Sequence, residues 1–276
     1  MTRTGPLINN CFVIQDGDNL STLHGGSLEQ PEAYVVPWDN DDDWYWPGHG
    51  QVIGSKLYMY MLRIRSTGAG GVWGFEHIGT DMAVFSLPDL ALIDQYEVVR
   101  SKQYLMGVST YREDNLIYIY GTRSTLGKRA LAARISVHNP EVIEYWTGTE
   151  WSTQFAPDAH MKHMNGEDLI VSNQFTVFKY KGKYRLLTQE DFLGSGIYLY
   201  TSDSPTGPWA APQLVYDTPE SGGNIFTYNA FLHEHINHSQ KGYLVTYSVN
   251  SQNFGDLFAD ASIYRPRYFW LKESDN

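Results

Sequence analysis

Apolar and polar positions alternate with a period of two along several tyrosine-rich stretches of the chain. Clear cases are KLYMYMLRIR, LIYIYGTR and YLVTYSV, which are separated by turn residues such as Gly, Asn, Asp and Lys. Alternation of this kind indicates β-strands, and no helical periodicity of comparable length occurs. The pattern therefore predicts an all-β fold of short antiparallel strands.

A unit of three or four strands recurs four times. Each copy has a short strand, a turn with Gly or Lys, a Tyr-rich strand, a polar loop, a third strand and often a fourth. The copies begin about 60 positions apart, near His49, Gly107, Asn173 and Asn229. Four antiparallel strands per repeat predict the blades of a β-propeller, with a β-sandwich as the alternative.

An incomplete blade precedes these repeats. The segments NNCFVIQDG and NLSTLHGG have the pattern of third and fourth blade strands, without a first and a second. We therefore expect one domain over 1–276, a five-bladed β-propeller of four-stranded antiparallel blades with an incomplete first blade. Its segments are a half-blade at 8–26 and repeats near 46–100, 106–152, 170–216 and 224–272. A propeller closes its ring to remove sheet edges, so a second chain or a missing segment would complete the first blade.

Composition narrows the classes of partner. The 276-residue chain is 42% hydrophobic, and its net charge of −11 disfavours nucleic acid and anionic membranes, which need a basic surface. Aromatic residues make up 14% of the chain, and their rings can stack on sugars. Cys11 is the only cysteine, so no internal disulfide can form. The first ten residues lack the apolar core of a signal peptide, which leaves the compartment open.

The motifs of common metal and cofactor sites are missing. The segment HEHINH places His233 and His235 on one face of a strand, but Asn237 occupies the last histidine position of the zinc motif H-E-x-x-H. No glycine-rich loop with an adjoining helix is present to bind phosphate or a dinucleotide. We therefore expect neither a metal nor a cofactor, with His233 as a hydrogen-bonding residue.

Seven motifs carry a family resemblance between residues 8 and 272. They are WYWPGHG, LIYIYGTRS with LAARISV, YRLLTQED with IYLYTSDSPTGPW, and TYNAFLHEH with GYLVTYSVNS. Together they resemble five-bladed propellers classed as domains of unknown function, some of which are endo-D-arabinanases, a class of glycoside hydrolase. The resemblance implies the propeller fold, a carbohydrate ligand such as the furanosides of arabinan, and an extracellular or cell-surface (secreted) location.

The chain departs from that family at the catalytic positions. Members tend to carry one Asp in a Gly-Asp-Gly element and another at the end of the next strand, and both strands are absent from the first blade here. His49 stands where relatives often have the Asp of a Pro-Gly-Asp-Gly turn. Two functions therefore remain open: a hydrolase, and a non-catalytic glycan-binding or scaffold propeller that has lost the acids.

Ligands of β-architectures bind at concave mouths, which in a propeller are lined by the starts of the innermost strands and the loops after the second strands. Amides and guanidinium groups there would bond sugar hydroxyls, and one aromatic, Trp46, would form a floor while Trp44 and Tyr45 pack as walls. The expected substrate-binding residues are Trp46, His49, Arg63, Arg123, Asn173, Gln189, Asp191, Tyr228, Asn229, His233 and Asn250.

Hydrolysis of a glycosidic bond requires two carboxyl groups. Glu190, at the end of a second strand, and Asp43, before the aromatic cluster, are the candidate catalytic acids. Glu190 could instead be a solvated loop acid or an ion-pair partner of Arg123 or Arg63. Asp43 could instead be an exposed member of the acidic run DNDDDW.

Overall fold

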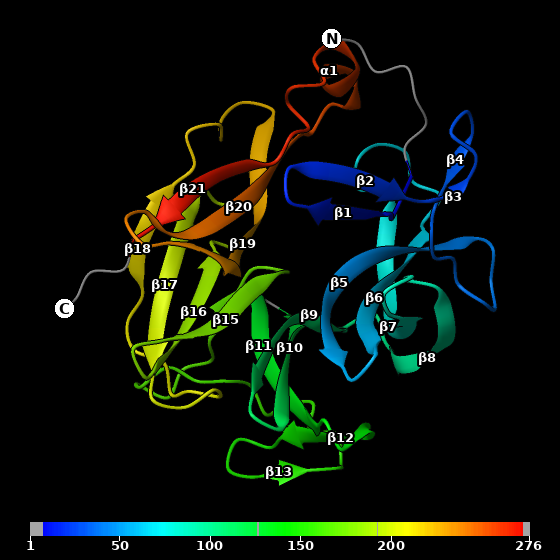
Figure 1. Ribbon diagram of the computed structural model, residues 1–276. Helices are drawn as coiled ribbons and strands as arrows, with labels where there is room; N and C mark the ends of the chain where they lie inside the picture. The colour runs from blue at the N-terminus through cyan, green and yellow to red at the C-terminus, as the bar shows by residue number, and fades with distance from the viewer. Residues whose placement is uncertain (1–7, 126, 192, 273–276) are drawn as a thin grey trace. The chain divides into compact units, whose positions relative to one another are not determined.

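The computed structural model describes residues 8–125, 127–191 and 193–272 (Figure 1). The chain divides into two compact units, which we call the N-terminal unit (Arg3–Gly107) and the C-terminal unit (from Val108 onward). The fold is all-β, with antiparallel strands in the sheets of a β-propeller. Among the described residues, no helix has the length and apolar character needed to cross a membrane.

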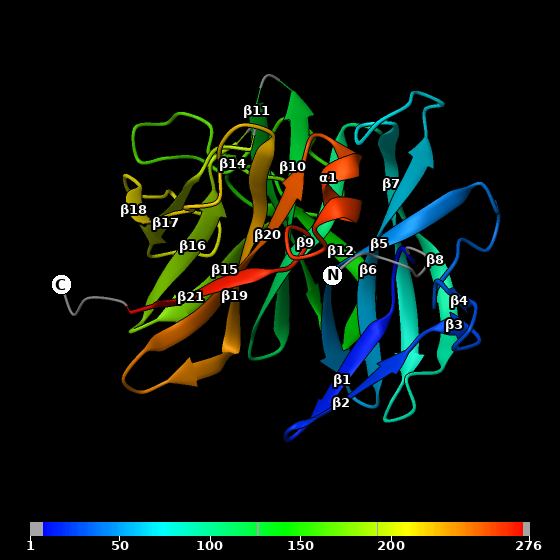
Figure 2. The same ribbon diagram turned by 90° about the horizontal axis from the view of Figure 1, so that it is seen from above.

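One four-stranded blade forms the body of the N-terminal unit (Figure 2). Its strands pair in chain order and are β5 (Asp43–Ile53), β6 (Lys56–Ser66), β7 (Phe75–Ser86) and β8 (Leu92–Arg100). Tyr60 to Ile64 of β6 are all buried, so both faces of this middle strand are covered.

Two small hairpins precede that blade. They are formed by β1 (Phe12–Asp16) with β2 (Asn19–Leu23), and by β3 (Gly25–Gly26) with β4 (Pro31–Glu32). Phe12 packs edge-on against Phe85 of the blade core, with ring centroids 5.1 Å apart. Val13 and Leu20 are 62% and 69% exposed, so the first hairpin buries little beyond Phe12.

The C-terminal unit contains three further blades. The first has β9 (Tyr104–Glu113, which starts in the N-terminal unit), β10 (Leu116–Thr125), β11 (Gly127–Ser136), β12 (Asn139–Trp146) and β13 (Trp151–Ser152), with β14 (Ile170–Val171) paired to β11. The second has β15 (Phe175–Tyr180), β16 (Lys183–Gln189), β17 (Gly196–Ser202) and β18 (Gln213–Asp217). The third has β19 (Ile225–His238), β20 (Gly242–Ser251) and β21 (Arg267–Leu271), with the short helix α1 (Phe254–Ala259) between its last two strands.

The blade count differs from the expected five. The described residues form four blades, and the last of them has three strands rather than four. In place of the expected half-blade at 8–26, β1 and β2 form a hairpin and, among the described strands, pair only with each other. Most residues of both strands are exposed, so the hairpin buries little apolar surface. A two-stranded ribbon of this kind has no full hydrophobic face and does not count as a blade.

Apolar side chains join the last two blades face to face. Phe178 and Leu187 from one sheet share a buried cluster with Leu232 and Val245 from the other. The amide of Leu232 also donates to Thr176 Oγ1 at 3.0 Å, which fixes β19 against β15. This packing places the ends of β16 and β19, which carry several predicted site residues, beside one another.

Close approach of β9 to β6 requires glycine at position 107. Gly107 has a φ of +77°, and a Cβ there would overlap the ring of Tyr60, which is itself buried. We expect Gly107→Ala to lower the free energy of unfolding by about 3 kcal/mol, from left-handed backbone strain plus overpacking. Gly54→Ala is the matched control, because Gly54 has a φ of +61° with open space around it. Equal losses in urea denaturation would show that the contact with Tyr60 contributes nothing.

Candidate functional site

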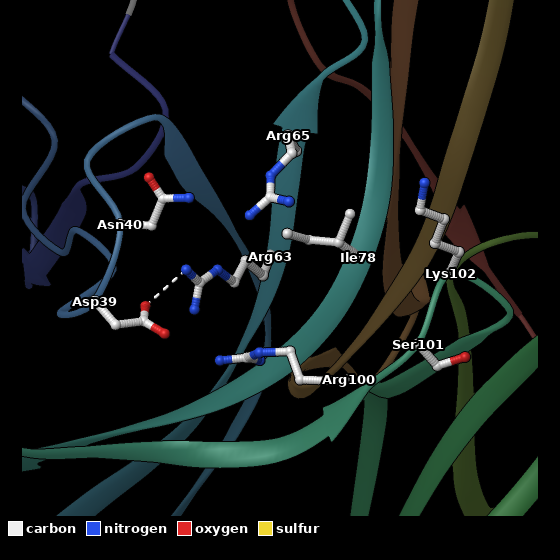
Figure 3. A pocket seen from close by; sticks show the side chains of 8 residues that line it. All are labelled: Asp39, Asn40, Arg63, Arg65, Ile78, Arg100, Ser101 and Lys102. Carbon is white, nitrogen blue, oxygen red and sulfur yellow. Dashed lines mark ion pairs between the residues drawn. The ribbon is translucent and has the colours of Figure 1, made fainter.

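A pocket of about 470 Å³ lies in the N-terminal unit, at the ends of β6 and β8. Its lining residues are Asp39, Asn40, Arg63, Arg65, Ile78, Arg100, Ser101 and Lys102. Figure 3 shows the guanidinium groups of Arg63, Arg65 and Arg100 extending toward the loop that carries Asp39 and Asn40. Four lining side chains are cationic and one is anionic, so the net charge of the site depends on the carboxylates that pair with these cations.

Arg63 is the centre of a buried ion-pair network. Its Nε and Nη2 both lie 2.7 Å from Asp43 Oδ2, Nη2 lies 2.6 Å from Asp39 Oδ1, and Nη1 lies 3.4 Å from Asp81 Oδ2. Arg65 donates to both oxygens of Asp43, at 2.6 and 3.0 Å. The side chains of Asp43 and Asp81 are 0% and 1% exposed, so these carboxylates are enclosed by their partners.

The network fixes the protonation state of its members. Burial alone would raise the pKa of Asp43, but the hydrogen bonds from Arg65 and Arg63 outweigh it and hold that pKa below its ordinary value. Burial and the hydrogen bond to Asp81 (2.5 Å) raise the pKa of Tyr45 well above its usual value. Asp43 is therefore ionised and Tyr45 is a proton donor at neutral pH. An ionised Asp43 can accept a proton as a base or hold the arginines in place, but it cannot donate a proton.

In the aromatic segment 44–46, Tyr45 is packed in the blade core, as expected, and is 0% exposed. Trp46 is half-buried and packs edge-on against Phe75, with centroids 4.7 Å apart. His49 is half-buried on β5, where the register with β6 shifts. Neither Trp46 nor His49 lines the pocket.

In the C-terminal unit, three predicted site residues are consecutive at the end of β16. Gln189 is buried, and its amide donates to Gly194 O at 2.9 Å and to Thr227 Oγ1 at 2.8 Å. Glu190 is exposed, with its backbone amide bonded to Gly196 O. Asp191 is ion-paired with Lys128. Of the two adjacent acids, Asp191 anchors the turn and Glu190 faces solvent.

The remaining predicted residues are distributed over β10, β15, β19 and β20. Arg123 is paired with Asp158, and Asn173 is exposed just before β15. Asn229 adopts a φ of +55° at a register shift in β19. His233 Nε2 lies 2.8 Å from Thr246 Oγ1, and burial, together with His235, lowers its pKa, so it is neutral at pH 7.

Tyr228 and Asn250 belong to one polar group on β19 and β20. Burial raises the pKa of Tyr228, Tyr264 raises it further, and hydrogen bonds with Asn250 and Ser248 oppose the rise. Tyr228 is therefore a hydroxyl donor at neutral pH. Within the part of the chain that the structure describes, no three His, Cys, Asp or Glu side chains are grouped to hold a metal ion.

The structure thus brings together Asp43 with Arg63, Gln189 with Glu190 and Asp191, and Tyr228 with Asn250. Sequence reasoning did not select most of the pocket, namely Asp39, Asn40, Ile78, Arg100, Ser101 and Lys102. One signal was available, since R-S-K directly follows the apolar end of the fourth strand of this repeat. Two cations at a strand end indicate a polar edge, although they do not identify their carboxylate partners.

Comparison with known proteins gives a family match and structural similarities. Residues 1–273 match the family described as "Domain of unknown function (DUF5005)". No curated protein matches the sequence.

Solved structures share the fold at low identity. A candidate hydrolase from Bacteroides ovatus has a TM-score of 0.73 and 19% identity, covering 88% of this chain and 67% of that one. An endo-arabinase from Bacteroides thetaiotaomicron has a TM-score of 0.52 and 12% identity, covering 97% and 95%. The GH43_1 enzyme from Xanthomonas citri, solved with xylose, has a TM-score of 0.52 and 15% identity, covering 87% and 72%. Identities this low establish the fold alone.

The buried charge of Asp43 predicts a pH-dependent contribution to stability. We expect Asp43→Asn to lower the free energy of unfolding by about 3 kcal/mol at pH 7, because two guanidinium groups lose their shared partner. Because the pKa of Asp43 is lower in the folded protein, this contribution is complete above the ordinary Asp pKa and fades as pH falls below about 4.

Urea denaturation of both proteins at pH 7, 5 and 3 measures this difference. Asp42→Asn is the control, because Asp42 is the exposed neighbour in the same acidic run. An equal loss for Asp43→Asn at pH 3 and pH 7 would contradict an electrostatic origin.

Proposed function

Since the chain belongs to the family described as a domain of unknown function (DUF5005), whose description assigns no activity, we propose one from its fold and its acids. The proposed activity is that of a glycoside hydrolase acting on a furanoside-containing polysaccharide such as arabinan. The observation that carries this proposal is the propeller fold, because two of the similar structures are a GH43_1 enzyme and an endo-arabinase.

In this proposal Glu190 is the proton donor. Its side chain is exposed at the end of β16, and Gly194 lies directly against it, where a Cβ would overlap the Glu190 carboxyl group. The ion pair between Asp191 and Lys128 fixes the same turn. A turn held in this way limits the loss of conformational entropy when a catalytic side chain is positioned.

Hydrolysis also requires a carboxylate. Asp43 is ionised, but its side chain is 0% exposed and both of its oxygens accept from Arg63 and Arg65. The proposal therefore names Glu190 alone and gives Asp43 a structural role. One carboxyl group protonates the glycosidic oxygen, which leaves with its sugar. The carboxylate either takes a proton from a water that attacks the anomeric carbon, or attacks that carbon itself to form a glycosyl-enzyme intermediate that a water then hydrolyses. We further propose that Asn173, Tyr228 and Asn229, which belong to the same unit as Glu190, contact the sugar.

A second function, a non-catalytic glycan-binding propeller, is favoured by one observation. Both oxygens of Asp43 are occupied by Arg63 and Arg65, a geometry typical of a structural anchor. The two functions differ in turnover and share saturable sugar binding.

We also propose that the β1–β2 hairpin is covered by a further strand-bearing segment or a second chain. Val13 and Leu20 are largely exposed on this hairpin, and each of its strands has an unpaired edge among the described residues. Unpaired edges with apolar side chains favour addition of a strand. An extracellular or cell-surface location follows from a polysaccharide substrate and is part of the proposal.

Glu190→Gln is expected to reduce the turnover of D-arabinan at least 100-fold while changing the dissociation constant less than twofold, because the amide cannot donate the proton. Reducing-end release and isothermal titration measure the two quantities. Glu141→Gln is the control, since Glu141 is an exposed acid on β12 of the same unit. Wild-type turnover in Glu190→Gln would remove Glu190 from the mechanism. Saturable binding without any turnover by the wild type would favour the non-catalytic function.

A further inference from the structure

The proposed hydrolysis assigns no role to most of the residues that line the pocket of Figure 3. We propose that this pocket binds a neutral, hydroxyl-rich sugar unit, through Asp39, Asn40, Arg65 and Arg100, with Trp38 beside them. Its volume of about 470 Å³ falls within the range of small-molecule sites. The identification of this sugar as a unit of the furanoside polysaccharide rests on the proposed function. The inference that the pocket binds a sugar at all rests on the residues of the pocket.

The charges of the pocket favour a neutral ligand. Every lining cation is paired with at least one carboxylate: Arg63 with Asp39, Asp43 and Asp81, Arg65 with Asp43, Arg100 with Asp81 and Glu97, and Lys102 with Glu76. These four cations face five acids, in a chain whose net charge is −11. An anionic ligand would have to compete with carboxylates that are already in place. Hydroxyl groups can add hydrogen bonds without displacing an ion.

The pocket offers both donors and acceptors, which sugar hydroxyls need because each one donates and accepts. Asp39 bonds Arg63 through Oδ1, yet its side chain is 46% exposed and can accept from a ligand hydroxyl. Arg65 is 45% exposed, and two of its five N–H groups bond Asp43. Asn40 and Ser101 add an amide and a hydroxyl to the same lining.

An aromatic surface lies beside these polar groups. Trp38 is 47% exposed, and Arg100 Cζ lies 5.9 Å from the centroid of its ring. A ring next to hydrogen-bonding side chains matches the two sides of a sugar, whose C–H face stacks on aromatics while its hydroxyls bond polar groups.

Buried carboxylates hold the binding groups in place before a ligand arrives. Asp43 fixes Arg65, Asp81 fixes Arg100, and both acids have side chains no more than 1% exposed. Arg63, 2% exposed, in turn fixes Asp39. Side chains that are already ordered lose less entropy on binding, so the pocket is preorganised for a ligand.

Asp39→Asn is the decisive variant, because it changes neutral and anionic binding in opposite directions. We expect it to weaken binding of arabino-trisaccharides of the D or L series about fivefold, through loss of a charged acceptor. At an anion site the same change would tighten binding, because it removes the only acid of the lining. Asp89→Asn is the matched control, at an exposed acid in the turn between β7 and β8.

Isothermal titration with the arabino-trisaccharides, trigalacturonate and inorganic sulfate separates the outcomes. Trp38→Ala is the second variant and should also weaken trisaccharide binding, with folding of each variant checked by circular dichroism. The proposal is overturned if neither trisaccharide binds, if Asp39→Asn and Trp38→Ala leave binding unchanged, or if trigalacturonate or sulfate binds more tightly than the trisaccharides. Reducing-end release is measured in parallel. Binding without release contradicts only the hydrolysis, and release with unchanged binding in both variants contradicts only this pocket.

Discussion

The buried guanidinium of Arg63 is the constraint on which the N-terminal unit depends. A charge removed from water is strongly unfavourable unless it is paired and fully hydrogen-bonded. Arg63 satisfies this requirement only when Asp43 at the start of β5, Asp81 on β7 and Asp39 in the preceding loop are all in place. One side chain on β6 therefore fixes both neighbouring strands and the loop that forms one wall of the pocket.

This constraint also separates the acids of the chain by role. Asp43 and Asp81 are both enclosed by arginines, and Arg65 and Arg63 hold the pKa of Asp43 below its ordinary value, so Asp43 is ionised at neutral pH. Glu190 is exposed, next to Asp191, which is ion-paired with Lys128. The compensated network leaves a pocket that is polar without a strong net charge. We accordingly propose different residues for proton donation and for sugar binding by the pocket, each with its own supporting contacts.

The strand pattern predicted the blades well, because alternation and turn residues are local properties. The three stretches with the clearest alternation, KLYMYMLRIR, LIYIYGTR and YLVTYSV, lie in β6, β10 and β20. The count of five was wrong, since the pattern of 8–26 could not show that its hairpin lacks partners among the described strands. The pocket was harder to predict. Asp43 and Asp42 look alike within DNDDDW, and only the long-range contacts with Arg63 and Arg65 show that one is buried and the other exposed.

The central claim, that this propeller cleaves a furanoside polysaccharide, is tested most directly by incubating the wild-type protein with D-arabinan, L-arabinan and xylan and measuring the release of reducing ends. We predict release from an arabinan, and less or none from xylan. Release from none of the three, by protein shown to be folded and to bind sugar, would contradict it.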